Sequence, residues 1–209
     1  GSAPHHSKDP VLMAGLAIVQ LQSIVSRRID PLETAILTIG SVQSGVDRNV
    51  IPTESRLKLK LHFSTPEVHE DMINSIKRIC DNIALSNGVS EDNLPTYIHQ
   101  GFAPANVNSE AFISSIRETL AKVDFVDRVF NDIQVSGSDD AAALIEGIGE
   151  VKGAYLMVGT ADPKIFAEAQ ANGHFLPFTP HNPDYQVDLN GIPYGAKLAA
   201  IIALDVLNK

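Results

Sequence analysis

The stretch that most constrains the fold is "SRLKLKLHFS" at residues 55–64, where apolar and polar residues alternate strictly. The apolar residues at alternate positions from Leu57 to Phe63 share one face, and the two lysines and His62 share the other. Because successive side chains of a strand point to opposite faces, this pattern predicts a strand with one buried and one solvated face. We therefore expect an antiparallel sheet that is covered on one side.

The neighbouring segments complete an α-β-β-α-β order. Asp9 and Pro10 suit the cap and first position of a helix, Thr65 suits a second cap, and Gly88 suits the end of that second helix. The predicted elements are a helix over about 9–28, strands over 35–45 and 55–64, a helix over 65–88 and a strand over 93–102.

This order is the split βαβ, ferredoxin-like pattern of an α+β domain, with its first strand missing. In that topology the first strand lies inside the sheet, and a fold without it leaves backbone groups unpaired. The pattern therefore indicates that the chain is a piece of something larger.

The second half begins after a segment rich in proline and asparagine, "APANVNSE" at 103–110. Strands and helices then alternate, which predicts an α/β domain over 103–209 beside the first domain over 1–102. The expected elements are a helix over 108–122, a strand near 128–135, a helix over 139–147, an apolar strand over 153–160, a long loop around His181 and a final helix over 193–207.

Composition limits the functions that the chain can have. Its 209 residues are 44% hydrophobic, which suits a soluble globular protein of one large or two small domains. A net charge of −9 makes nucleic acid an improbable partner, because an acidic chain repels phosphates. The longest apolar stretch, "PVLMAGLAIVQLQSIV", carries two glutamines, and we expect a buried helix rather than a membrane span.

The single cysteine, Cys80, excludes an internal disulfide and falls at helical spacing from two isoleucines, which favours a buried structural thiol. The polar start "GSAPHHSKDP" shows no signal peptide, and its first two residues could be a cloning scar. We expect a cytoplasmic protein.

His181 is the first of three places that could carry chemistry. It lies in "PHNP", where the flanking prolines restrict the backbone, and its imidazole could bind a metal, transfer a proton or simply pack. His174 and Asp184 are near in sequence, but their spacing is atypical of a zinc site.

The other two places are loops. In "SGSDDAA" (136–142), Ser138 could cap a helix whose first turn holds Asp139 and Asp140, or the turn could bind a polar ligand at a sheet edge. In "SGVDRNVIP" (44–52), Asn49 either shapes a turn or donates a hydrogen bond to a carbonyl or oxyanion.

Taken in order, these motifs resemble the metal-dependent N-acyl-amino-acid amidohydrolases, the group of hippurate hydrolases, aminoacylases and indoleacetyl-amino-acid hydrolases related to carboxypeptidase G. The most specific stretch is "LQSIVSRRIDPLETAILTIGSVQSGVDRNVIP", which is similar to the lid domain of that family. "GSDD" stands where the family has Gly-Ser-Glu-Asp, and "PHNPDYQVDLNGIPYGA" resembles its C-terminal motif.

The resemblance implies the C-terminal half of a homodimeric enzyme that cleaves the amide bond of small N-acyl amino acids with two divalent metals, zinc or manganese. By this resemblance, 1–102 is most of a lid that also dimerises, and 103–209 is the C-terminal part of an α/β catalytic domain. The other ligands belong to an N-terminal half that this sequence lacks, so we expect no tightly bound metal on this chain alone. The implied site residues are His181 as metal ligand, Asn49 and His5 as catalytic residues of the lid, and Asp139, Asp140 and Gly159 around the substrate.

The chain departs from the family pattern at two positions. His62 stands where relatives commonly carry an arginine, and "GSDD" followed by alanine lacks the longer glutamate and the phenylalanine. Two other interpretations stay open: a stand-alone ferredoxin-like binding or dimerisation module without catalysis, and a local zinc site of His174, His181 and Asp184. An autonomous module would need the strands over 35–43 and 94–101 to find partners within this chain.

Overall fold

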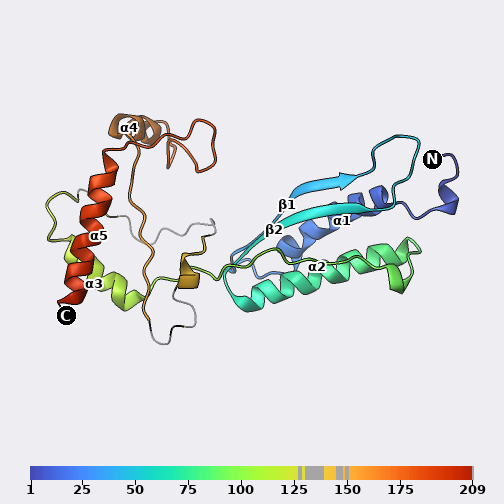
Figure 1. The fold of residues 1–209 in the computed structure, drawn as a ribbon, viewed down its shortest axis with the longest axis horizontal. Coiled ribbons are helices and arrows are strands. Elements are labelled where there is room, and N and C mark those ends of the chain that lie inside the picture. Colours follow the sequence, from blue (N-terminus) through green and yellow to red (C-terminus); the bar gives the residue numbers. More distant parts are fainter. Residues whose placement is uncertain (127–128, 130–138, 145–147, 149–150, 209) are drawn as a thin grey trace. The chain divides into compact units, whose positions relative to one another are not determined.

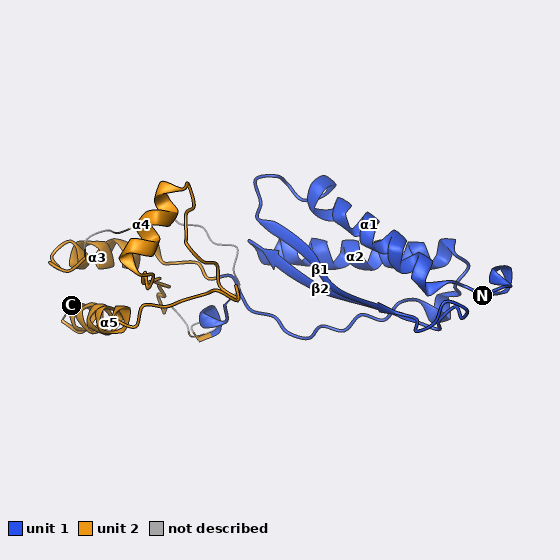
Figure 2. Ribbon diagram, turned by 90° about the horizontal axis from the view of Figure 1, so that it is seen from above, with its two compact units in different colours: residues 1–105, 134–143 blue, residues 106–133, 144–209 orange. Residues whose placement is uncertain are grey.

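The computed structural model describes all residues except 127–128, 130–138, 145–147, 149–150 and 209. The chain forms two compact units, coloured separately in Figure 2. Unit 1 comprises residues 1–105 and 134–143, and unit 2 comprises 106–133 and 144–209. The roles expected for 1–102 and 103–209 stay predictions.

Unit 1 contains a β-hairpin and two long helices (Figure 1). Its elements are the 3-10 helix η1 (Pro4–His6), α1 (Pro10–Arg27), β1 (Ala35–Ser44), β2 (Ser55–Phe63), α2 (Pro66–Ser86) and the 3-10 helix η2 (Glu91–Asn93). Both long helices begin as predicted: Asp9 Oδ1 accepts the Val11 N–H at 2.8 Å, and Thr65 Oγ1 accepts the Val68 N–H at 3.3 Å. The two helices and the hairpin are therefore confirmed.

β1 and β2 pair antiparallel, from Ala35 opposite Phe63 to Ser44 opposite Ser55. The register shifts between Ile39 and Ser41, which leaves Gly40 as a bulge. Figure 2 shows α1 and α2 on one side of the hairpin. The apolar face of β2 packs against those helices, as the alternation of residues 55–64 predicts.

The core of unit 1 lies between this face and the helices, and Leu21, Ile24 and Met72 are fully buried in it. Cys80 is half-buried and packs against the same core. The expectation of a buried helix holds for one face of α1 only, because Val19 on the other face is 75% exposed. By length and composition alone α1 could cross a membrane, with a mean hydropathy of 1.3 over 18 residues, but here its buried face forms the core.

The strand predicted over 93–102 is wrong. Residues 94–100 belong to no sheet, and the described sheet contains β1 and β2 alone. Tyr97 instead attaches the segment to α2, since its hydroxyl donates to Asp81 Oδ1 at 2.7 Å and lies 3.3 Å from the Lys77 carbonyl oxygen. A strand needs a neighbouring strand to complete its hydrogen bonds, and the described residues offer none here.

Unit 2 is built on three described helices, α3 (Glu110–Leu120), α4 (Pro163–Ala171) and α5 (Gly191–Leu207). α3 and α5 lie close to the predicted bounds, whereas the sequence predicts a loop where α4 forms. Asp162 caps α4 by accepting the Lys164 N–H at 2.8 Å, and Pro163 takes its first position. This Asp-Pro start is the pattern that correctly predicted α1.

Two predictions in this half are corrected. Residues 153–160 form no strand: Tyr155 exchanges hydrogen bonds with the Asn108 side chain, and the Gly153 carbonyl accepts the Ser109 N–H. The helix over 139–147 is reduced to the 3-10 helix η3 (Ala141–Leu144), and 145–147 lie outside the described residues. The strand predicted near 128–135 lies outside them too, apart from residue 129.

Candidate functional site

His181 has an unusual backbone conformation. Its φ is +67°, and among the described residues every other positive φ belongs to a glycine. The Asn182 N–H donates to the Thr179 carbonyl at 3.2 Å, which closes a four-residue turn over 179–182. With Pro180 second and a positive φ third, this is a type II turn, and His181 occupies the position that normally requires glycine.

A second turn follows directly and shares Asn182. The Asn182 carbonyl accepts the Tyr185 N–H at 3.0 Å, and its side-chain Oδ1 accepts the Asp184 N–H at 2.8 Å. Pro183 takes the second position of this turn. His181 is therefore held on an exposed double turn, with its imidazole at the surface of unit 2.

The loop that follows is tied to the segment of Gly159. The Asp188 N–H donates to the Thr160 carbonyl at 2.7 Å. Gly191, the first residue of α5, packs so closely that a Cβ there would lie 3.2 Å from Thr160 Cγ2. Gly159 is exposed, and an added Cβ would meet nothing within 4 Å, so the position lies open to a ligand.

His5 belongs to η1, and Asn49 lies in the loop between β1 and β2. Gly1 lies against the backbone of Asn49, since a Cβ on Gly1 would come 2.6 Å from the Asn49 carbonyl oxygen. Asp47 shapes the loop by accepting the Asn49 N–H at 2.8 Å. The Asn49 side chain is exposed, so its amide can reach a ligand.

Asp139 has a local structural role. Its Oδ1 accepts the Ala141 N–H at 2.8 Å at the start of η3, while the expected cap Ser138 lies outside the described residues. Asp139 and Asp140 are exposed and belong to unit 1, whereas Gly159 and His181 belong to unit 2.

The local zinc site of His174, His181 and Asp184 is wrong. Within the part of the chain that the structure describes, no three His, Cys, Asp or Glu side chains form a group that could hold a metal. His174 lies just beyond α4, where its carbonyl accepts from Gln170 Nε2 at 2.8 Å. As a metal donor, His181 supplies one imidazole, a type of ligand that zinc commonly accepts.

An aromatic cluster near the end of β2 contains His69. The His69 ring lies 4.5 Å from the Phe63 ring and 5.3 Å from the Phe102 ring. Burial lowers the pKa of His69, and His99 lowers it further. Burial and the charge of Lys60 lower the pKa of His62, so this residue cannot replace the permanent cation of an arginine.

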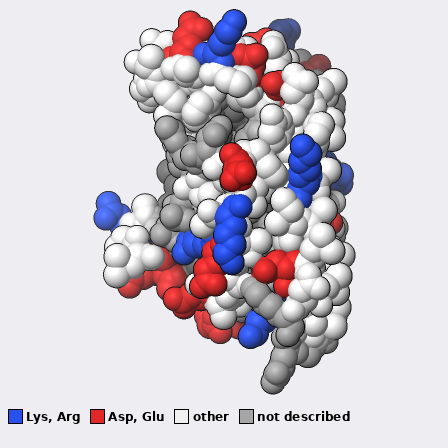
Figure 3. Space-filling view, turned by 90° about the vertical axis from the view of Figure 1, so that its left-hand side faces the viewer, with Lys and Arg blue, Asp and Glu red and all other residues white. Residues whose placement is uncertain are grey.

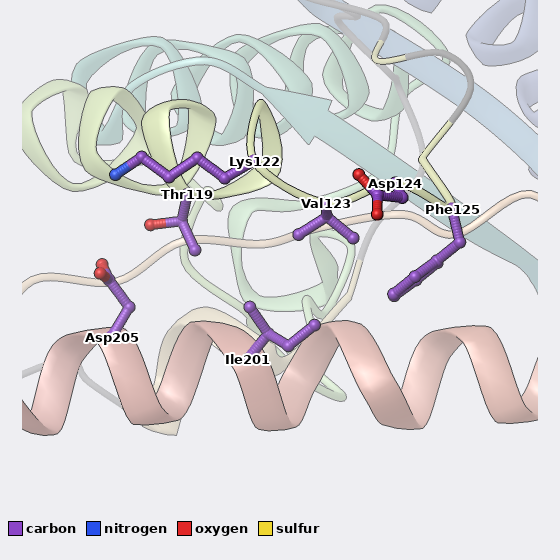
Figure 4. Close-up of a pocket in the computed structure, with 7 residues that line it drawn as sticks. All are labelled: Thr119, Lys122, Val123, Asp124, Phe125, Ile201 and Asp205. Carbon is purple, nitrogen blue, oxygen red and sulfur yellow. The ribbon is translucent and has the colours of Figure 1, made fainter.

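An open hollow of about 480 Å³ lies between α3 and α5 (Figure 4). Val123, Phe125 and Ile201 line it together with charged residues, and none of the residues predicted for the site does. On the face drawn in Figure 3, acidic and basic side chains are interspersed. The hollow therefore lies where α3 packs on α5, and it is separate from the residues predicted for the site.

Sequence reasoning missed two residues that shape the His181 loop, Asn182 and Asp188. The dipeptide Asn182-Pro183 is a turn motif and could have indicated the first. The second contact, from Asp188 to Thr160, joins residues that are 28 positions apart, and no local pattern predicts it.

Comparison with known proteins gives a consistent result. Residues 1–87 match the family model described as the peptidase dimerisation domain. Hippurate hydrolase from Campylobacter jejuni is 35% identical over 89 residues, which cover 43% of this chain and 23% of that protein. N-acetylcysteine deacetylase from Bacillus subtilis is 24% identical over 204 residues, which cover 98% of this chain and 48% of that protein.

Among solved structures, a Bacillus subtilis protein described as a dinuclear metal binding peptidase from the M20 family superimposes with a TM-score of 0.62 at 19% identity. The match covers 96% of this chain and 47% of that chain. At this identity the likeness shows the fold. The chain spans about half the length, or less, of the relatives it matches.

Proposed function

We propose that this chain, whose residues 1–87 match a peptidase dimerisation domain, is the C-terminal half of an M20-type amidohydrolase that cleaves the amide bond of N-acyl amino acids or similar small conjugates. The resemblance inferred from the sequence is confirmed, and so is the coarse α/β class. Two of the relatives are named for N-acyl amino acids, hippurate and N-acetylcysteine, which supports this substrate class.

The observation that carries the proposal is the conformation of His181. A histidine in the left-handed region costs free energy that a glycine at the same turn position would avoid. Strained residues persist where the function needs the side chain. We assign His181 as a metal ligand, presented by its imidazole from the double turn.

One imidazole is too few for a tight metal site, since a catalytic zinc usually has three protein ligands. We therefore propose that the remaining ligands lie in a part of the enzyme outside this chain. When bound, two divalent ions would polarise the scissile carbonyl and lower the pKa of water. A relative described as a dinuclear metal binding peptidase supports the number of ions, and zinc or manganese is our proposal.

The lid supplies the other contacts in this proposal. The exposed Asn49 amide would donate a hydrogen bond from Nδ2 to the oxygen of the reacting carbonyl, where negative charge develops. His5, in η1, would act together with Asn49, and its contact would cross the interface of a homodimer. Asp139 and Asp140 would line the substrate pocket, and Gly159 would admit the substrate close to the backbone.

The stand-alone module is less well supported. It needed the segment 94–101 to find a strand partner within the chain, and the described residues provide none. The alignment along 98% of the chain with a deacetylase also extends well beyond the dimerisation domain.

The test compares the isolated 209-residue chain with the full-length enzyme. Zn²⁺ and Mn²⁺ are titrated by calorimetry, and release of free amino acid is followed on a panel of N-acetyl and N-benzoyl amino acids. We expect the full-length enzyme to bind metal and hydrolyse members of the panel, and His181→Ala to lose both properties. The isolated chain should bind weakly and hydrolyse nothing; sub-micromolar stoichiometric binding or hydrolysis by it would refute the proposal of an incomplete site.

A further inference from the structure

The backbone around His181 is restricted at every neighbouring position. Pro180 and Pro183 have φ fixed by their rings. Thr179 and Asn182 each precede a proline, which disfavours the helical region for them. His181 is the one residue of 179–183 that no proline restricts directly, so other contacts must select its left-handed conformation.

Asn182 provides those contacts. Its backbone N–H closes the turn that contains His181, at 3.2 Å from the Thr179 carbonyl oxygen. Its backbone carbonyl and its Oδ1 hold the next turn, through the N–H groups of Tyr185 and Asp184 at 3.0 and 2.8 Å. One residue therefore joins the two turns and fixes the direction in which the chain leaves His181.

We propose that Asn182 is a positioning residue for His181, acting through the bond from its side-chain Oδ1 to the Asp184 N–H. This inference rests on the proposed function of His181 as a metal ligand. A glutamine keeps the amide but is one methylene longer, so it cannot close the same two-residue bond. A serine hydroxyl makes the equivalent turn more weakly.

The side-chain bond is exposed and is worth a modest free energy, so its loss should weaken metal binding about three- to tenfold. Removing other groups that orient metal ligands lowers metal affinity or activity about 10–100-fold, so the effect expected for Asn182 is at or below the lower end of that range. In the variant the loop is less ordered before metal binds. Part of the binding free energy is then used to order it, which lowers the affinity.

The experiment titrates Co²⁺ into the metal-free full-length enzyme and records both the affinity and the visible absorption bands, which report ligand geometry. We expect Asn182→Ala and Asn182→Gln to bind Co²⁺ about three- to tenfold more weakly, with altered band intensities, and Asn182→Ser to lie nearer the wild type. The melting temperature of each metal-free variant is measured in parallel, because a purely structural role would lower it and leave the Co²⁺ bands unchanged.

Wild-type affinity and bands in Asn182→Ala, together with loss of Co²⁺ in His181→Gly, would overturn the positioning role and leave the proposed function standing. Wild-type Co²⁺ affinity and bands in Asn182→Gln, together with weaker binding in Asn182→Ala, would also overturn the positioning role. The amide would then act without its bond to the Asp184 N–H. Retention of Co²⁺ by His181→Gly would overturn the proposed function and, with it, this inference.

Discussion

His181→Gly should make the metal-free enzyme more stable while removing its ability to bind metal. At a φ of +67° every residue with a Cβ is strained, and the third position of a type II turn normally carries glycine. The imidazole is exposed, so its removal sacrifices little packing. The two properties, stability and metal binding, should therefore change in opposite directions.

The expected gain follows from two opposing terms. A left-handed conformation costs a residue with a Cβ about 1–2 kcal/mol, and glycine avoids this cost. Glycine also loosens the unfolded chain, which lowers stability by about 0.4–1 kcal/mol. The midpoints of the two terms leave a net gain of about 0.8 kcal/mol, or about 2–3 °C in melting temperature for a cooperative unit of about 150–250 residues.

The assay compares His181→Gly with His181→Ala, because alanine loses the same imidazole but keeps the strained Cβ. Both variants are unfolded thermally with excess chelator, followed by circular dichroism at 222 nm. We expect His181→Gly to melt above the wild type and His181→Ala close to it. If the alanine variant proved the more stable of the two, the strain at His181 would be refuted.

In the full-length enzyme, Asn49→Ala should lower kcat on N-acyl amino acids far more than it raises KM, since one lost oxyanion donor costs about 3 kcal/mol; an unchanged kcat would reduce Asn49 to a turn residue. The intact enzyme should have the mass of a dimer at micromolar concentration in light scattering, with the long edge of β1 in the interface, and a monomeric mass would contradict this. The stability of unit 1 should be fully present above about pH 6.5, the unfolded pKa of histidine, and should decrease as pH falls through the lowered pKa of His69, because the unfolded chain then binds more protons. His69→Phe should reduce this pH dependence in thermal melts between pH 5 and pH 8, and an unaltered slope would rule out His69 as its source.

Local patterns predicted the parts of this fold that depend on neighbouring residues. The alternation from Leu57 to Phe63 and the caps Asp9 and Thr65 each appear in the structure as predicted. The strands predicted over 93–102 and 153–160 do not form, because a strand requires a neighbouring strand. The composition of a segment does not show whether such a neighbour exists. Tyr97 packs against α2 instead, whereas Ile98 and Met157 stay exposed.

For the candidate site, the sequence predicts the motif but not its backbone conformation. The motif of His181 was recognisable from its prolines, but the sign of its φ was not, because the sequence Pro-His-Asn permits several turn types. The contact of Asp188 with Thr160 depends on how the chain folds back in unit 2, so it emerged from the structure alone.

The attachment of Tyr97 to α2 makes this residue an optical reporter. The chain has no tryptophan, and the other tyrosines, Tyr155, Tyr185 and Tyr194, all lie in unit 2. Burial, followed by the hydrogen bond to Asp81, raises the pKa of Tyr97 well above its usual value near 10. The absorbance of tyrosinate in alkaline solution would then rise for Tyr97 only when the segment leaves α2, so a simple titration can follow the release of the polypeptide that leads out of unit 1.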